Sequence, residues 1–71
     1  MKTKDGYKVA SGMLITKGAV PFEEHAIIVD KVDDDSITYT EAEWDEAAQG
    51  YYPTGDGGLM FADEVAEYEF M

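Results

Sequence analysis

The histidine of this chain directly follows two carboxylates, in the triplet Glu23-Glu24-His25. A carboxylate beside an imidazole can orient the ring as a general base, so acid–base chemistry would be sought first at this triplet. The histidine can equally well open a strand with its ring half exposed. A single histidine cannot by itself build a catalytic metal site, and the chain has no cysteine to supply a nucleophile or a thiolate ligand. We therefore expect no enzymatic activity, with no catalytic residue, metal site or cofactor.

Two other stretches contain residue types that bind ions. The segment Asp30–Glu41 begins and ends with a carboxylate, as a calcium-binding loop does. Asp35 occupies the position where such a loop needs glycine for its sharp turn, so we expect a β-hairpin turn instead. The run Gly55–Gly58 is rich in glycine, but no lysine follows it to contact a phosphate. A flexible turn is its expected structure.

Negative charge is concentrated in the second part of the sequence. The chain has sixteen acidic residues against five lysines, for a formal net charge of −11. All five lysines precede residue 32, whereas residues 32–71 contain twelve acids and no base. Such a charge repels nucleic acid and anionic membranes and attracts basic protein surfaces. Solubility is the simpler explanation of an acidic chain, but it does not explain why one region carries the excess.

The composition is that of one small folding unit. Its 71 residues predict a single domain, 1–71, and its 45% apolar residues with nine aromatic side chains exceed those of an acidic disordered tail. The longest strictly apolar run, Ala26–Val29, is far too short to span a membrane. The N-terminal residues 1–6 include lysines but no apolar stretch follows them, so no secretory signal is expected. We expect a cytoplasmic protein, located in a host cell if it is encoded by a phage.

Alternation and turn residues predict an antiparallel sheet. Asp5-Gly6 is a type I′ turn signal and predicts a short opening hairpin. The clearest strand is 25–32, whose apolar centre indicates burial on both faces. The aspartates at 33–35 then form a turn, and 36–40 returns as the partner strand. Further strands are predicted at 7–10, 13–16 and 59–61, with loops at 17–21 and 51–58.

One short helix is predicted at residues 41–49. Thr40 and Glu43 have the spacing of a capping box, and Gly50 has the position of a C-terminal cap. Trp44 falls in the apolar stripe of this helix, so we expect it in the core.

The tail at residues 64–71 is compatible with a strand or a helix, and its alternation favours a strand with Ala66, Tyr68 and Phe70 facing the core. Together these elements predict an α+β fold. It is either a small antiparallel sheet or a partly open SH3-like barrel, with one short helix at about 41–49.

The run HAIIVDKVDDDSITYTEAEW, residues 25–44, resembles the histidine-bearing half of the CHAP-type and NlpC-type papain-like peptidoglycan hydrolases. In that family a strand opens with the catalytic histidine, turns through acidic or glycine residues, and returns to a polar residue before a tryptophan. The resemblance covers roughly residues 11–48 and implies that His25 is the base, oriented by Glu41 or Glu43. The family's cysteine nucleophile has no counterpart here. The resemblance therefore implies an inactive barrel remnant that serves as a scaffold or a cell-wall-binding module.

The strong negative charge, together with the lack of a recognisable group of catalytic residues, favours a different function. We predict a non-enzymatic inhibitor that mimics nucleic acid and blocks a basic nucleic-acid-binding site on a partner protein. In type it is similar to small acidic phage proteins of the anti-CRISPR and anti-restriction kinds. No direct contact with nucleic acid or membrane is expected. An acidic subunit of a larger assembly is a further alternative. The residues expected to contact the partner are Asp33, Asp34, Asp35, Glu41, Glu43, Asp45, Glu46, Tyr51, Tyr52, Glu64, Glu67 and Glu69.

Overall fold

Five strands and one short helix follow one another along the chain. The computed structural model describes residues 1–17 and 25–70, with the backbone alone described at His25, so most of the loop predicted at 17–21 lies outside the described residues. The elements are β1 (Leu14–Lys17), β2 (His25–Val32), β3 (Ser36–Asp45), β4 (Gly50–Phe61), α1 (Ala62–Val65) and β5 (Glu69–Phe70).

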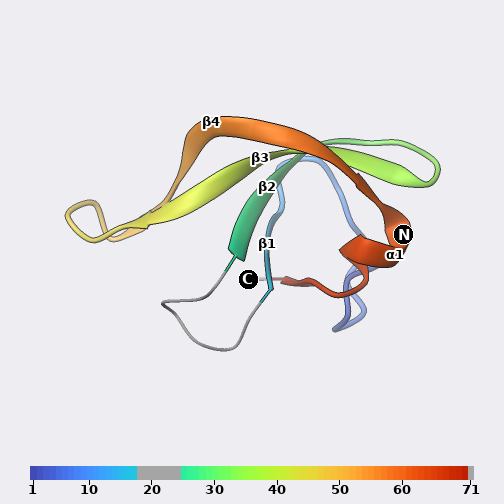
Figure 1. Ribbon diagram of the computed structural model, residues 1–71. Coiled ribbons are helices and arrows are strands. Elements are labelled where there is room, and N and C mark those ends of the chain that lie inside the picture. The colour runs from blue at the N-terminus through green and yellow to red at the C-terminus, as the bar shows by residue number, and fades with distance from the viewer. Residues whose placement is uncertain (18–24, 71) are drawn as a thin grey trace.

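The strands form one antiparallel sheet in the order β4-β3-β2-β1-β5 (Figure 1). Because β4 and β5 lie at opposite edges, the sheet is open and does not close into a barrel. The predicted fold class, a small antiparallel sheet with one short helix, is confirmed. The position predicted for the helix is wrong, as described below.

The central β2–β3 hairpin is confirmed. β2 spans the predicted residues, and Asp33–Asp35 make the turn into β3. The pairing shifts by one residue at Asp30, which forms a β-bulge. The Oγ1 of Thr40 donates a hydrogen bond of 2.7 Å to Oδ2 of Asp30 and fixes the bulge from the neighbouring strand. A bulge increases the local twist of a sheet, and the sheet arches in Figure 1.

The hydrophobic core lies on one face of the sheet. Ile15, Ile27 and Ile37 come from three adjacent strands and are fully buried. Val9, in the N-terminal segment, and Val65, in α1, cover them from the other side. The remaining members of the buried cluster are Val29, Met60 and Tyr68. Burying one such aliphatic side chain stabilises the fold by about 1.5–3 kcal/mol.

The opening hairpin forms, but its turn differs from the prediction. Gly6 has a φ of 89°, whereas Asp5 does not have a positive φ. A type I′ turn needs positive φ at both central residues, so the turn is instead the longer kind that ends in a left-handed glycine. The strand predicted at 7–10 is reduced to one bridge, between Lys8 and Lys2.

The two ends of the described chain are held together by a set of contacts that we call the terminal clasp, made by Thr3, Asp5, Tyr7 and Phe70. Oδ1 of Asp5 accepts hydrogen bonds from Oγ1 of Thr3 and, at 3.2 Å, from the N–H of Phe70. The rings of Tyr7 and Phe70 lie 4.9 Å apart. The hydrogen bond from Thr3 lowers the pKa of the Asp5 carboxyl below its usual value.

The prediction of a helix at 41–49 is wrong. β3 continues to Asp45, and the following residues form a turn. Trp44 pairs with Tyr51 on β4, and the two rings meet edge to face at 5.3 Å. The capping signal at Thr40 is local, and an isolated helix this short is marginal in water. Cross-strand aromatic pairs and the ladder between β3 and β4 outweigh it.

The prediction of a loop at 51–58 is also wrong, because these residues belong to β4, which begins at Gly50. The strand predicted at 59–61 is the last part of β4. The register between β3 and β4 shifts within this stretch, where Gly55 has a φ of 96°. At Gly57 an added Cβ would lie 2.4 Å from the backbone oxygen of Tyr39. The glycine at this position therefore permits a close approach of two strands and does not make a flexible turn.

The tail was predicted to be a strand at 64–71, but most of its described residues are not in a strand. Residues 62–65 form α1, and β5 is limited to two residues paired with β1. Tyr68 is buried as predicted, but Ala66 and Phe70 are exposed. Val65 and Tyr68 are three residues apart, so a helical turn brings both into the core, whereas strand alternation would point one of them outwards.

Candidate partner-binding surface

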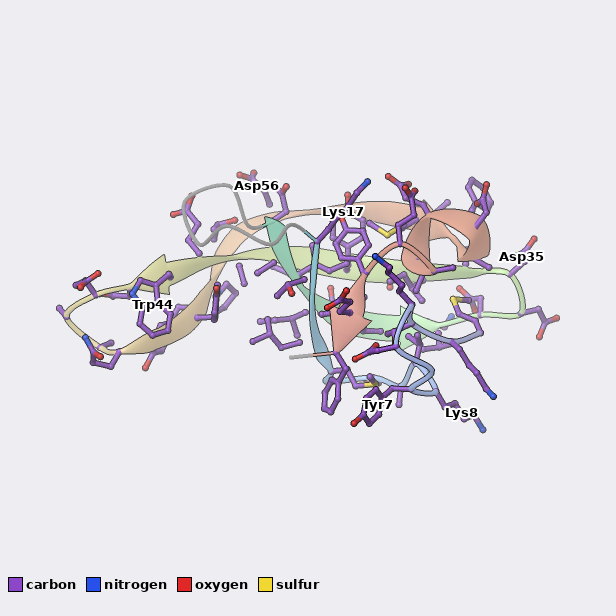
Figure 2. All side chains as sticks on the ribbon, turned by 90° about the horizontal axis from the view of Figure 1, so that it is seen from below. Tyr7, Lys8, Lys17, Asp35, Trp44 and Asp56 are labelled. Carbon is purple, nitrogen blue, oxygen red and sulfur yellow. The ribbon has the colours of Figure 1, made fainter. Side chains whose placement is uncertain are left out.

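A two-stranded arm projects from one end of the sheet. The described pairing of β2 with β3 begins at Ala26 opposite Ala42, so beyond this point β3 pairs with β4 alone. We call residues 43–52 the β3–β4 arm. It extends to the left in Figure 1, and Figure 2 shows Trp44 near its outer end.

Hydrogen bonds within the arm fix its tip. Oδ1 of Asp45 accepts from the N–H groups of Ala47 and Ala48, at 3.0 and 3.3 Å. Nε2 of Gln49 donates to the backbone oxygen of Glu46 at 2.7 Å. Gln49 itself is left-handed, with a φ of 55°. Side chains that sequence patterns assign to a helix thus close a hairpin turn instead.

Two aromatic side chains of the arm face solvent. Trp44 is 48% exposed and Tyr52 is 52% exposed. Nε1 of Trp44 donates to Oε2 of Glu46 at 3.3 Å, which orients the indole beside a carboxylate. The prediction that Trp44 lies in the core is wrong, because the arm extends beyond β2 and the core cluster contains no residue of it. An open groove of about 380 Å³ is lined by Glu43, Trp44, Asp45, Glu46, Tyr52, Pro53 and Thr54.

The arm carries a local excess of negative charge. Glu43 and Asp45 are two positions apart on β3, so their side chains leave the same face of the strand, and Glu46 follows in the turn. All three are exposed, and the ion pairs found between described side chains include none of them. Glu41 lies at the root of the arm and is half-buried. Five of the twelve predicted contact residues are in the arm: Glu43, Asp45, Glu46, Tyr51 and Tyr52.

The aspartates of the β2–β3 turn lie at the other end of the molecule. Figure 2 shows Asp35 and Trp44 at opposite ends of the sheet. Asp33 also faces a lysine, with its Oδ1 3.6 Å from Nζ of Lys31. The structure therefore does not bring this group together with the arm.

The three glutamates of the tail form a separate group around α1 and β5. Oε1 of Glu67 lies 3.6 Å from Nζ of Lys17, and Oε1 of Glu69 lies 3.8 Å from Nζ of Lys4. Glu64 is exposed on α1. Exposed pairs of this kind contribute little to stability, about 0–1 kcal/mol each, but they reduce the charge that this group presents to a partner.

Tyr68 is a buried residue whose pKa departs strongly from its ordinary value. Burial raises the pKa of its phenol to about 12, and the charges of Glu64 and Glu41 act in the same direction. The phenol is therefore neutral at physiological pH. Its place in the core cluster makes it a structural residue rather than part of a reactive site.

The histidine and the two ion-binding motifs lie on β2, β3 and β4. His25 opens β2, and its side chain lies outside the described residues. Glu41 and Glu43 lie on β3, the strand next to it. The calcium-like segment 30–41 forms the β2–β3 hairpin, and no group of three or more potential metal ligands occurs within residues 1–17 and 26–70.

The sequence pattern contained one signal that locates the arm. Trp44 and the pair Tyr51-Tyr52 lie on either side of a short polar stretch, which is the spacing of cross-strand partners around a hairpin turn. The helical interpretation of residues 41–49 hid this signal.

A scan of protein-family models, a search of curated proteins and a search of solved structures each gave no match to this chain. Over the described residues, no helix is long and apolar enough to cross a membrane.

Proposed function

We propose that this protein is a non-enzymatic interaction protein, and that its β3–β4 arm enters a basic, nucleic-acid-binding site on a partner. One observation carries the proposal. The arm projects beyond the core and carries two exposed aromatic rings and three exposed carboxylates, with no lysine. Aromatic residues in the centre of an interface contribute much of its binding energy. Complementary charge accelerates association and selects a basic partner.

Mimicry of nucleic acid is the specific form of this proposal. Alternate carboxylates on one strand face, at Glu43 and Asp45, are about 6.6 Å apart along the strand. They would occupy the positions of phosphates on the partner. Tyr52 is the cross-strand partner of Glu43, so it lies on the same face and supplies a flat ring where the partner's site would stack a base. This arrangement supports an inhibitor of the anti-CRISPR or anti-restriction type.

The two other acidic groups have a secondary part in this function. The Asp33–Asp35 turn and the tail glutamates are separated from the arm, and three of these six acids face lysines. They contribute a long-range negative potential that attracts a basic partner and that salt screens. Direct contact is assigned to the arm alone.

The test compares two triple charge reversals with the same change in net charge. One variant is Glu43→Lys with Asp45→Lys and Glu46→Lys, and the control is Asp33→Lys with Asp34→Lys and Glu64→Lys in the two other acidic groups. The partner is captured from the source cell at low salt and eluted with a salt gradient. The arm variant should lose the partner and the control should retain it. Added DNA or RNA should displace the partner from the wild-type protein.

Equal retention by both variants, or binding that salt and nucleic acid do not affect, would contradict the proposal. An equal loss in both variants would mean that net charge alone attracts the partner, and it would remove the special role of the arm. Circular dichroism of each variant establishes that the sheet is retained.

The inactive papain-like module remains the second candidate function. The observation that favours it is the β2–β3 hairpin, in which a strand opening at His25 returns through an acidic turn to Glu41 and Glu43. Peptidoglycan sedimentation with wild-type protein and His25→Ala tests this candidate. It requires binding that the substitution weakens and that Asp45→Lys with Glu46→Lys leaves intact.

A further inference from the structure

The outer edge of β4 differs from the opposite edge of the sheet. β4 stands first in the sheet order, with β3 on one side, so the other side of β4 is an edge of the sheet. β5 closes the opposite edge with two residues, whereas β4 has twelve. Proteins usually shorten edge strands or protect them with charge, proline or bulges. The last part of β4, Gly57–Phe61, has no charge and no proline.

Backbone hydrogen bonds show which groups face outwards at this edge. The N–H of Ala62 donates to the oxygen of Asp35 at 2.8 Å, so these two residues form a hydrogen-bonded pair. Such pairs alternate with non-hydrogen-bonded pairs along an antiparallel ladder. Met60 and Gly58 therefore direct their N–H and C=O groups towards β3. It follows that the N–H and C=O groups of the intervening residues, Gly57, Leu59 and Phe61, point away from the sheet.

Exposed apolar side chains accompany these outward groups. Leu59 is 55% exposed and Phe61 is 56% exposed. They lie two positions apart, so both leave the same face of β4. An added strand would gain backbone hydrogen bonds along the edge and apolar contact on one face.

Carboxylates stand at both ends of this edge. Asp56 precedes it, and Asp63 follows it on α1. Asp35 is at the same end as Asp63, because its backbone oxygen is bonded to Ala62. None of the three takes part in the ion pairs between described side chains, and neither β3 nor β4 contains a lysine.

We propose that the edge Gly57–Phe61 binds an extended segment of a partner protein as a sixth strand, and that this segment has apolar residues in its centre and lysine or arginine at both ends. Strand addition is an established mode of peptide recognition, in which backbone hydrogen bonds give affinity and alternate side chains give specificity. The acids at the two ends select the basic residues. An antiparallel second copy would instead place Asp56 beside Asp63 of the other molecule, and like charges oppose that pairing.

This surface is distinct from the arm, and the inference goes beyond the proposed function. The groove of the arm ends at Thr54, before the edge begins. A protein that uses both surfaces would hold a folded basic site with the arm and an extended basic segment with the edge.

The test uses three synthetic peptides with the 71-residue chain. The first is KRTVTVTKR. The second has the same sequence with N-methyl groups on the alternate central residues that would face β4, and the third has glutamate in place of every lysine and arginine. Binding is followed by amide hydrogen exchange and by titration at low and high salt.

The first peptide should slow exchange of the amides of Gly57, Leu59 and Phe61, with little change at Met60, whose amide is already bonded within the sheet. N-methylation should weaken binding by about tenfold or more, since it removes backbone hydrogen bonds. The acidic peptide should not bind. In the protein, Leu59→Pro removes one outward amide and should weaken binding, and Leu59→Ala is the control that keeps this amide.

Equal binding of the methylated peptide, or protection at the arm instead of residues 57–61, would overturn the proposal. Protection of these amides without peptide, together with a dimer mass in sedimentation, would assign the edge to a second copy and also overturn it. The arm charge-reversal variant should still bind the first peptide. A failure of the proposed function and a failure of this inference therefore give different results.

Discussion

Gly57 allows a sharp test of how closely β4 approaches β3. An alanine Cβ at this position would lie 2.4 Å from the backbone oxygen of Tyr39. Ordinary contacts between such atoms are near 3.5 Å, so the two strands must separate by about 1 Å. Overpacking of this kind costs about 1–3 kcal/mol, and the entropy advantage of alanine over glycine offsets about 0.5–1 kcal/mol of it. We expect Gly57→Ala to lower the free energy of unfolding by about 1–2 kcal/mol.

Gly58 is the matched control, because it is the next residue of the same strand. A Cβ there would lie 3.1 Å from the hydroxyl oxygen of Tyr39, at the far end of a side chain that can move. Gly58→Ala should therefore change the free energy of unfolding by less than about 0.5 kcal/mol. Urea denaturation followed by tryptophan fluorescence and circular dichroism measures both variants.

The comparison is feasible because a domain of this size has a total stability of about 4–10 kcal/mol. The slope of the urea dependence should be the same in both variants, which shows that the change lies in stability and not in the compactness of either state. A result in which Gly57→Ala is as stable as Gly58→Ala would refute the close approach, and residues 55–58 would then behave as the flexible turn that their composition indicates.

Three further predictions concern the core, the buried phenol and the terminal clasp. Ile27→Ala should lower the free energy of unfolding by about 2–5 kcal/mol in urea denaturation, because the side chain is fully buried in the central strand; a loss below about 1 kcal/mol would contradict its place in the core. The raised pKa of Tyr68, about 12 in the folded state against 10.0 ordinarily, stabilises the fold below pH 10, and this contribution should disappear as the pH rises from 10 to 12. Ultraviolet titration of phenolate checks it, and Tyr68→Phe should remove the step at highest pH. The lowered pKa of Asp5 stabilises the fold above its ordinary value of 3.8, and this contribution should be lost as the pH falls through the folded-state pKa; an NMR titration of the Asp5 carboxyl, with the Phe70 amide as reporter, should give a midpoint below 3.8.

The central part of the fold was predictable because its signals are redundant. β2 combines a run of β-branched residues with a turn of three aspartates, and β3 begins with a clear alternation. Pattern, turn and propensity therefore agree at residues 25–40. The sequence also predicted that the Asp5-Gly6 turn opens the chain, although the type of turn depends on the backbone angle of Asp5, which composition does not determine.

The arm and the tail were mispredicted because local and long-range signals compete there. Thr40 and Glu43 have the spacing of a helix cap, yet Trp44 gains a cross-strand partner on β4, Tyr51, which a helix at 41–49 would not give it. In the tail, alternation of glutamates with apolar residues imitates a strand, whereas burial of Val65 and Tyr68 together requires a helical turn. Long-range packing decided both segments.

For the candidate site, the sequence predicted some of the residues that form it but not their positions in space. The acids and tyrosines of the arm were named from charge and residue type, but the helical interpretation placed Trp44 in the core. The separation of the acids into three groups depends on the length of β3 and β4, because these strands carry the arm to one end while the aspartate turn remains at the other.

The terminal clasp has a consequence for the order of folding events. Asp5 and Phe70 are separated by 65 positions in the sequence, so their contact closes a loop that contains nearly the whole chain. Closing such a loop costs more chain entropy than forming any of the hairpins. We therefore expect the clasp to form after the rate-limiting step, so that Asp5→Ala accelerates unfolding and leaves the refolding rate nearly unchanged. In this molecule the clasp would then set how long the folded state lasts, while the β2–β3 hairpin sets how fast that state is reached.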